Sequence, residues 1–164
     1  MDDIAAAAGV TKPVLYQHFT SKRGLFIEVL RDVGGQLMAA LGTATGEATT
    51  GRDRVQAGFS AYFRFVTDNE PAFRVLFGAA ARNDPEFAVI VDGVLEEVAD
   101  AISQLIEIGG PPEQRRVLAH AVVGMAEATS RDALSPDGTA LEPERLATWV
   151  AELAWFGLRG IRTD

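Results

Sequence analysis

The chain contains 164 residues, of which 48% are hydrophobic and 23% are charged, and its net charge is −8. These proportions are typical of a soluble globular domain and exclude a disordered, collagen-like or disulfide-rich protein. Because the chain has no cysteine, disulfides, thiol nucleophiles and cysteine-ligated metal sites are also excluded. No apolar run approaches the roughly 18 residues of a membrane span, and the first residues do not resemble a signal peptide. We therefore expect a cytoplasmic protein with no membrane partner.

The charge is distributed unevenly along the chain. Residues 1–31 contain four basic and three acidic side chains, whereas residues 32–164 contain 11 basic and 20 acidic ones. Taken as one number, the net charge of −8 argues against a nucleic-acid partner. The distribution instead indicates a slightly basic N-terminal segment followed by an acidic body, which would repel DNA phosphates and confine DNA contact to that segment.

Hydrophobic residues recur with the 3.6-residue period of a helix, and no stretch shows the sustained alternation of a strand. The start of the chain predicts an alanine-rich helix over residues 2–8, which Gly9 stops. Thr11 can cap a second short helix that ends near His18, and Ser21 can cap a third.

The rest of the chain predicts a loop and then five more helices. The loop covers residues 42–51, and the helices are one that ends before Pro71, a short one with Phe73 and Phe77, one that Asp84 opens and the Gly-Gly-Pro-Pro run at 109–112 closes, one over 113–132 and one over 143–160. The predicted fold class is all-α.

Two short helices joined by a tight Gly-Val-Thr turn are the skeleton of a helix-turn-helix. In such a unit the second helix lies in the major groove of DNA, with its first side chains facing the base edges. Thr11 and Lys12 are hydrogen-bond donors at that end, and Tyr16 offers a hydroxyl one turn later. His18 and Lys22 can reach phosphates. The sequence therefore predicts a DNA-reading segment.

Four short strings in this segment occur in order and at fixed spacing: Asp3-Ile4-Ala5, Ala8-Gly9-Val10-Thr11, Leu15-Tyr16-x-His18-Phe19 and Ser21-Lys22-x-x-Leu25. Together they resemble the DNA-binding domain of the TetR/AcrR (tetracycline-repressor) family of transcriptional regulators, whereas the rest of the chain is similar to the family only in layout. The resemblance implies that Lys22 contacts a phosphate. Arg23 stands where the family often has an acidic residue, and we expect it to add another phosphate contact. The positions that the resemblance implies to face DNA are Thr11, Lys12, Pro13, Tyr16 and His18.

The family's DNA-binding unit normally starts with one further helix, so the resemblance implies an incomplete three-helix unit. This chain begins at Met1, where the second helix of that unit starts. Either the true start lies upstream or the chain is a truncated form. In the truncated form Ile4, Leu15 and Phe19 lose part of their cover, which costs about 1–3 kcal/mol for each large side chain left exposed.

We expect two domains, namely residues 1–42 with the truncated helix-turn-helix and its connecting helix, and residues 43–164 with effector binding and dimerisation. Aromatic side chains concentrate on the middle helices, and apolar pockets between helices are lined in this way, although ordinary core side chains would follow the same pattern. The candidate polar anchors are Arg64, Arg74, Arg82, His120 and Glu127. The candidate effector-binding residues are Phe59, Tyr62, Phe63, Phe73, Phe77, Phe87, Val91 and His120.

The last two helices carry long apolar faces. The resemblance implies that these faces pair with a second copy of the chain in a four-helix bundle and place two DNA-reading heads one turn of DNA apart. Alternatively, they close the core of a single chain. The candidate dimer residues are Leu118, Val122, Met125, Leu146, Trp149, Val150 and Leu153.

Enzymatic chemistry is not indicated. The chain has two histidines, His18 and His120, and it contains no HExxH motif, no glycine-rich phosphate loop and no GxSxG elbow. We therefore expect no catalytic site, no metal and no cofactor.

The sequence predicts a ligand-responsive transcriptional regulator that binds double-stranded operator DNA as a homodimer. The common mode of the family implies a repressor, and the apolar lining predicts release from the operator by a small apolar or aromatic effector. The alternative is a dimeric module that binds a small molecule but not DNA because the first helix is missing.

Overall fold

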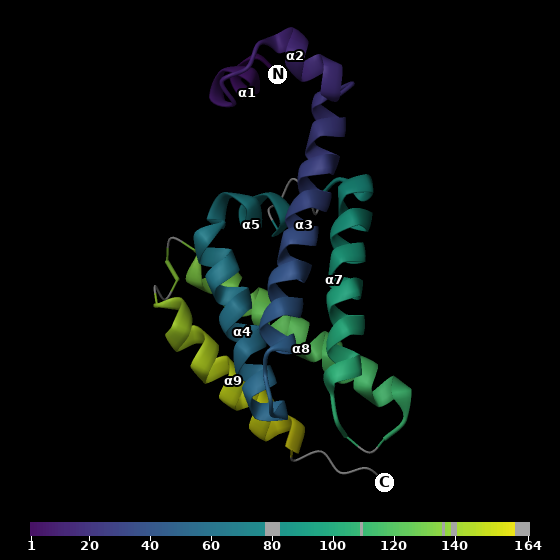
Figure 1. Ribbon diagram of the computed structural model, residues 1–164, viewed down its shortest axis with the longest axis vertical. Helices are drawn as coiled ribbons and strands as arrows, with labels where there is room; N and C mark the ends of the chain where they lie inside the picture. The colour runs from purple at the N-terminus through teal and green to yellow at the C-terminus, as the bar shows by residue number, and fades with distance from the viewer. Residues whose placement is uncertain (78–82, 109, 136, 139–140, 160–164) are drawn as a thin grey trace.

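The computed structural model describes residues 1–77, 83–108, 110–135, 137–138 and 141–159, and within them all regular structure is helical (Figure 1). The all-α prediction is therefore confirmed. None of the helices in these ranges is both long enough and apolar enough to cross a membrane. In chain order the helices are α1 (Asp2–Ala7), α2 (Lys12–His18), α3 (Lys22–Gly46), α4 (Gly51–Asp68), α5 (Glu70–Phe77), α7 (Pro85–Leu105), α8 (Pro112–Ala133) and α9 (Pro143–Arg159).

Most of the helix ends follow the local chemistry of the sequence. Gly9 follows α1 with a φ of 67°, a left-handed conformation that favours glycine. Ser21 caps α3 by accepting a backbone N–H at 3.0 Å, and the Asp84 carboxylate accepts two backbone N–H groups from the first turn of α7. Thr11 occupies the N-cap of α2, but its side chain accepts no capping hydrogen bond. These ends were readable from the sequence because capping is a local interaction.

The loop expected over residues 42–51 is largely wrong. Helix α3 continues to Gly46, and only residues 47–50 connect it to α4. The Thr45 hydroxyl donates to the Leu41 carbonyl at 2.8 Å within the helix, and Leu41 packs against the core. Tertiary packing has overridden the weak helix propensity of glycine and threonine here. As a result, α3 passes continuously through the boundary expected between residues 42 and 43.

Helix α3 runs along the centre of the body, the part of the molecule from residue 22 onward, with α4 and α7 on either side of it (Figure 1). Leu30 and Phe63, which are 0% and 1% exposed, lie deep in this core. A Cβ atom at Gly34 would lie 2.5 Å from Val94 Cγ2, so α3 and α7 approach more closely than a larger residue at position 34 would permit. The same long helix therefore forms the middle of the core.

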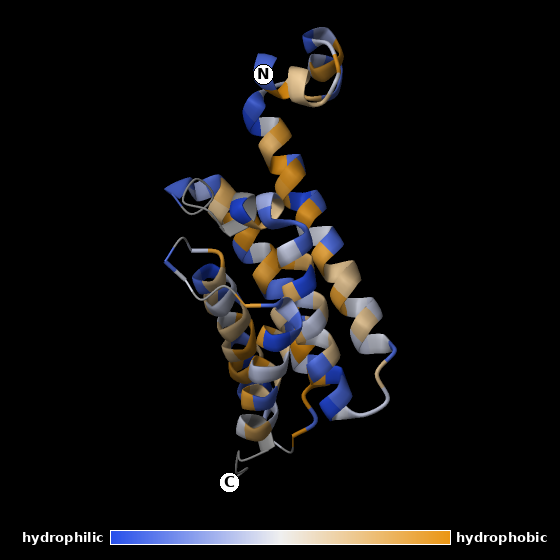
Figure 2. Ribbon diagram, turned by 90° about the vertical axis from the view of Figure 1, so that its left-hand side faces the viewer, coloured by the Kyte–Doolittle hydropathy of each residue, from blue (hydrophilic) through white to orange (hydrophobic). Residues whose placement is uncertain are grey.

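Helices α1 and α2 lie at the start of α3, away from the rest of the molecule (Figure 1). We call residues 1–21 the head. Its buried residues are Ala5 and Leu15, whereas Val10 and Val14 are exposed. Figure 2 shows apolar residues recurring along α3 from the head into the body. The head is thus a small unit carried on the end of a helix that belongs to the core of the body.

Candidate DNA interface and effector cavity

The outer surface of α2 carries side chains that can contact DNA. Leu15 is the buried residue of this helix, and it faces the head's own small core together with Ala5 of α1. Packing on one side of the helix leaves the other side free for a partner. The residues of the expected DNA-facing set that are exposed here are Thr11, Lys12, Pro13, Tyr16 and His18.

Lys12 forms an ion pair within the head. Its Nζ atom lies 2.9 Å from Asp2 Oδ1 and donates a hydrogen bond to Asp2 Oδ2 at 3.0 Å. This hydrogen bond lowers the pKa of Asp2 and raises that of Lys12. Both side chains are at least half exposed, so water screens the pair and it adds little to stability. The ammonium group remains accessible to a DNA partner.

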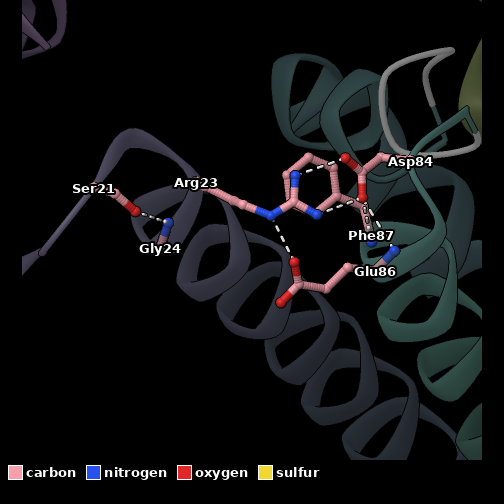
Figure 3. Close-up of polar contacts among 6 residues, drawn as sticks. All are labelled: Ser21, Arg23, Gly24, Asp84, Glu86 and Phe87. Atoms are coloured by element: carbon pink, nitrogen blue, oxygen red, sulfur yellow. Dashed lines mark hydrogen bonds and ion pairs between the residues drawn. The ribbon is translucent and has the colours of Figure 1, made fainter.

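The first turn of α3 is attached to the first turn of α7 through Arg23 (Figure 3). The two terminal nitrogens of Arg23 each donate to the Asp84 carboxylate at 2.7 Å, and Arg23 Nε donates to Glu86 Oε2 at 2.6 Å. The guanidinium carbon lies 4.6 Å from the centre of the Phe87 ring. We call this set of four residues the Arg23 clamp.

The hydrogen bonds of the clamp favour the charged forms of Asp84 and Arg23. Hydrogen bonding to Arg23 is the main reason why the pKa of Asp84 falls to about 2, and the backbone N–H groups that Asp84 caps contribute further. Hydrogen bonding to Asp84 and Glu86 likewise raises the pKa of Arg23. The guanidinium that the sequence assigned to a DNA phosphate is therefore held by the body in this structure. The partners stand 61 and 63 residues away along the chain, so no local pattern could have revealed them.

A second contact continues the same junction into the core. The Phe87 ring lies 4.5 Å from the ring of Phe26, centre to centre, and Phe26 sits three residues after Arg23 on α3. Phe26 and Phe87 both pack against the main hydrophobic core. The first two turns of α3 are thereby attached to α7 by ionic and aromatic contacts together.

A cavity of about 580 Å³ lies among α3, α4, α7 and α8, and the end of α9 closes part of it. Its wall is mainly apolar. The apolar and aromatic side chains that line it include Leu37, Met38 and Leu41 of α3, Val55, Phe59 and Tyr62 of α4, Leu95, Val98 and Ile102 of α7, Val122, Val123 and Ala126 of α8, and Trp155 of α9.

Few charged groups reach this cavity. Arg54 lines it and donates to Glu107 at 3.0 Å, and the Glu107 side chain is 75% exposed, which places that side of the cavity near solvent. Glu127 lines the wall on α8 and pairs with Arg131. Burial raises the pKa of Tyr62, so its phenol stays uncharged. The cavity is thus suited to a largely apolar molecule.

Comparison with known proteins bears on both parts of this arrangement. The family model described as "Bacterial regulatory proteins, tetR family" matches residues 1–29, and the model described as "Tetracyclin repressor-like, C-terminal domain" matches residues 51–157. The chain is also 31% identical over 160 residues to the HTH-type transcriptional activator FasR from Mycolicibacterium smegmatis, a match that covers 96% of this chain and 73% of FasR. The chain belongs to the TetR family.

Solved structures of two other regulators share the fold. A TetR-like transcriptional regulator from Rhodococcus sp. RHA1 is 25% identical with a TM-score of 0.76, and the match covers 98% of this chain and 84% of that one. The fatty acid degradation regulator FadR from Bacillus halodurans is 18% identical with a TM-score of 0.79, over 98% of this chain and 88% of FadR. The resemblance drawn from the short N-terminal strings is therefore confirmed, and it extends through the body.

As a TetR-family protein, the chain is a ligand-responsive, DNA-binding transcriptional regulator with an N-terminal helix-turn-helix. Proteins of this family bind operator DNA, dimerise and bind small-molecule effectors. The head lies within the part of the chain that the first family model matches, and most of the residues that line the cavity lie within the part that the second one matches.

The candidate effector residues are only partly gathered at the cavity. Phe59 and Tyr62 line it. Phe87 belongs to the Arg23 clamp, and the side chain of Phe77 lies outside the described residues. The remaining aromatic and aliphatic candidates are buried in the core and are not among the lining residues, namely Phe63, Phe73 and Val91. In the structure these three residues are ordinary core side chains.

Most of the candidate polar anchors have partners elsewhere. Arg64 pairs with Glu144, and Arg74 pairs with Glu70. His120 is exposed and its Nε2 lies 3.7 Å from Glu96, whereas Arg82 lies outside the described residues. Of the candidates that the structure describes, only Glu127 lines the cavity. In the described part of the chain no group of three His, Asp or Glu side chains is placed to hold a metal ion.

The candidate dimer residues divide into two groups. Trp149 and Leu153 are 51% and 65% exposed on α9, where a second chain could reach them. The other five are partly buried and pack against cores of their own chain: Leu118, Val122, Met125, Leu146 and Val150. For those five the alternative explanation, that they close the core of a single chain, matches their packing.

The residues that sequence reasoning missed are mostly aliphatic. Leu37 and Met38 line the cavity from α3, and Val98 and Ile102 line it from α7. They belong to ordinary apolar stripes, which a helix shows whether its face meets a packed core or a cavity. Trp155 was the missed residue with the clearest signal, because it lies on a different side of α9 from Trp149.

Proposed function

We propose that this protein is a homodimeric, operator-binding repressor that leaves DNA when a small apolar molecule occupies the cavity. One observation carries the proposal. Helix α3 bears the head at its first turn, and further along it lines the cavity with Leu37, Met38 and Leu41. A molecule that enters the cavity therefore contacts the helix that carries the DNA-reading unit, and a displaced helix can move that unit as a rigid body.

The proposed effector is mainly apolar, either aliphatic or aromatic. The volume of about 580 Å³ is within the ~300–1,000 Å³ of typical small-molecule sites. Leucine, valine and isoleucine side chains supply most of the wall, and Phe59 and Trp155 add aromatic surface. Arg54 and Glu107 can interact with a polar group at the side nearest solvent.

The proposed DNA contacts follow from the exposed surface of the head. Thr11, Lys12 and Tyr16 would face base edges in the major groove, with Pro13 setting the first turn of the reading helix. His18 and Lys22 would contact phosphates. We leave Arg23 out of this set because each of its three side-chain nitrogens already donates to Asp84 or Glu86.

The proposed dimer surface is the outward face of the last two helices. Val117 of α8 and Trp149, Leu153 and Phe156 of α9 are each more than half exposed. Large apolar side chains that are exposed can mark a contact with another molecule. A second copy of the chain is the proposed partner, and the two heads would then bind half-sites about one turn of DNA apart.

Activation is a second candidate for the direction of regulation. FasR, which is 31% identical to this chain, is a transcriptional activator. A reporter gene placed behind the DNA next to the protein's own gene separates the two modes. Deleting the regulator raises expression from a repressed promoter and lowers it from an activated one.

Fluorescence anisotropy with the same DNA tests the proposed function directly. We expect decane or naphthalene to weaken DNA binding of the wild-type protein by at least about fivefold, the lower end of typical allosteric coupling. Ile102→Trp fills part of the cavity and should abolish this response, whereas Val89→Trp, on an exposed position of the same helix, should respond like wild type. A response that persists in Ile102→Trp would contradict the cavity as the effector site. Ligand binding without DNA binding would favour the alternative of a small-molecule module.

A further inference from the structure

The Arg23 clamp has a geometry that holds the first turn of α3 in one orientation. A guanidinium that binds one carboxylate through two nitrogens is fixed in a plane, and here Nε is bound to a second carboxylate as well. Phe87 covers the guanidinium carbon at 4.6 Å. Rotation of Arg23 about any of its bonds breaks at least one of these contacts.

The acidic side of the clamp is itself attached to the backbone. Asp84 Oδ1 accepts the backbone N–H of Glu86 at 3.0 Å, and the same oxygen accepts from Arg23 at 2.7 Å. Asp84 is the N-cap of α7, so its position is set by the start of that helix. Arg23 therefore links two helix ends, not two mobile side chains.

The clamp also lies next to the residue that the family resemblance places on DNA. Lys22 precedes Arg23 directly and is exposed at the start of α3. The head contacts the body mainly through its covalent connection to this turn, since α1 and α2 pack chiefly on each other. The orientation of the head relative to the body therefore depends on the first turn of α3.

We propose that Arg23 is a positioning residue, which, through Asp84, Glu86 and Phe87, fixes the orientation of the head and of Lys22 relative to the body without binding a phosphate itself. The DNA readout of this inference rests on the proposed operator-binding function, whereas its conformational readout does not. A phosphate contact and a positioning contact differ in the salt dependence of DNA affinity, because only the former releases counterions from DNA.

The first test compares Arg23→Gln with Lys22→Gln in DNA titrations at several salt concentrations. We expect Arg23→Gln to weaken binding about fivefold, as when about one fifth of the dimers keep both heads in the productive orientation, with the slope of log affinity against log salt unchanged. Lys22→Gln should reduce that slope by about one for each head. Arg31→Gln removes another arginine of α3, one that pairs with Glu28, and should change neither quantity.

The second test needs no DNA. Because the chain has no cysteine, spin labels can be attached at Gln17→Cys on the head and Gln104→Cys on α7, with excess unlabelled protein added so that distances within one chain are measured. We expect a narrow distribution in the otherwise unchanged protein and a broad one after Arg23→Gln. Asp84→Asn keeps a good N-cap residue but removes the charge. It should broaden the distribution to the same extent, and combining both changes should add nothing.

Two results would overturn the inference. One is a distance distribution that stays narrow in both Arg23→Gln and Asp84→Asn. The other is a salt slope that falls by about one for each head in Arg23→Gln, which would make Arg23 a phosphate contact. If the wild-type protein fails to bind the DNA, the proposed function fails, and the spin-label distances still decide whether Arg23 positions the head.

Discussion

The head and the body differ in how many helices supply the proposed functional side chains. In the head the proposed DNA-facing set occupies the outer side of one short helix, α2, and its N-cap, and its members lie within residues 11–18. In the body the cavity is enclosed by side chains from α3, α4, α7, α8 and α9. A site on one helix surface leaves a compact pattern in the sequence. A site enclosed between helices leaves only apolar stripes, which have the same appearance as a packed core.

The two regions also differ in how much core supports them. The head buries Ala5 and Leu15, whereas the body has a large continuous cluster around Leu30 and Phe63. Burial of apolar surface is the main favourable term in folding. We therefore expect the core of the body to supply most of the free energy of unfolding of the chain. The head, with its small core, should be destabilised by changes that leave the body unaffected.

The largest expected effect is in the centre of the body. Leu30→Ala removes a side chain that is 0% exposed and should lower the free energy of unfolding by about 2–5 kcal/mol. Urea denaturation followed by circular dichroism measures this loss. Val89→Ala, at a position 70% exposed, is the control and should change the same free energy by less than about 0.5 kcal/mol. Equal effects of both changes would contradict the burial pattern.

An intermediate effect is expected in the head. Leu15→Ala removes the largest buried side chain of α1 and α2 and should weaken binding to operator DNA more than about tenfold, since about 1.4 kcal/mol of lost head stability corresponds to that factor. The urea midpoint of the body should stay at its wild-type value, because Leu15 lies outside the main core cluster. A shift of that midpoint as large as the one for Leu30→Ala would show that head and body unfold as one unit.

The smallest effect is expected at the Arg23 clamp, and it is a change with pH in the stability that the contact between Arg23 and Asp84 contributes. The pKa of Asp84 is lowered to about 2 by its hydrogen bonds to Arg23, so this carboxylate stabilises the folded state above its unfolded pKa of 3.8 and loses that contribution as the pH falls through about 2. The stability difference between wild type and Arg23→Gln should therefore be constant from about pH 7 to 5 and shrink between about pH 4 and 2. Urea midpoints across this range measure it. A difference that persists unchanged at pH 2 would show that Asp84 is not the group involved.

Much of the fold was readable from the sequence because it rests on local interactions. Gly9, Ser21 and Asp84 end or begin their helices as expected, since capping and a positive φ involve only near neighbours. The loop expected over 42–51 was wrong for residues 42–46, because the packing of Leu41 against the core keeps that part of α3 helical.

The candidate effector residues differ in whether they reach the cavity. Phe59 and Tyr62 line the cavity, whereas Phe63, which is one position further along α4 than Tyr62, is buried in the core. One step along a helix rotates a side chain by about 100°, and which direction meets a cavity depends on where neighbouring helices are packed. The apolar pattern contains no information about that choice.

By itself, the sequence determined the all-α class, most helix ends and the family of the protein, because these depend on residue types at short, fixed spacings. Only the tertiary structure decided where the cavity lies and that Arg23 is bound to Asp84 and Glu86. The physical reason is distance along the chain. The residues that meet in the clamp are more than 60 positions apart, and only the packing of α7 beside α3 brings them within hydrogen-bonding distance.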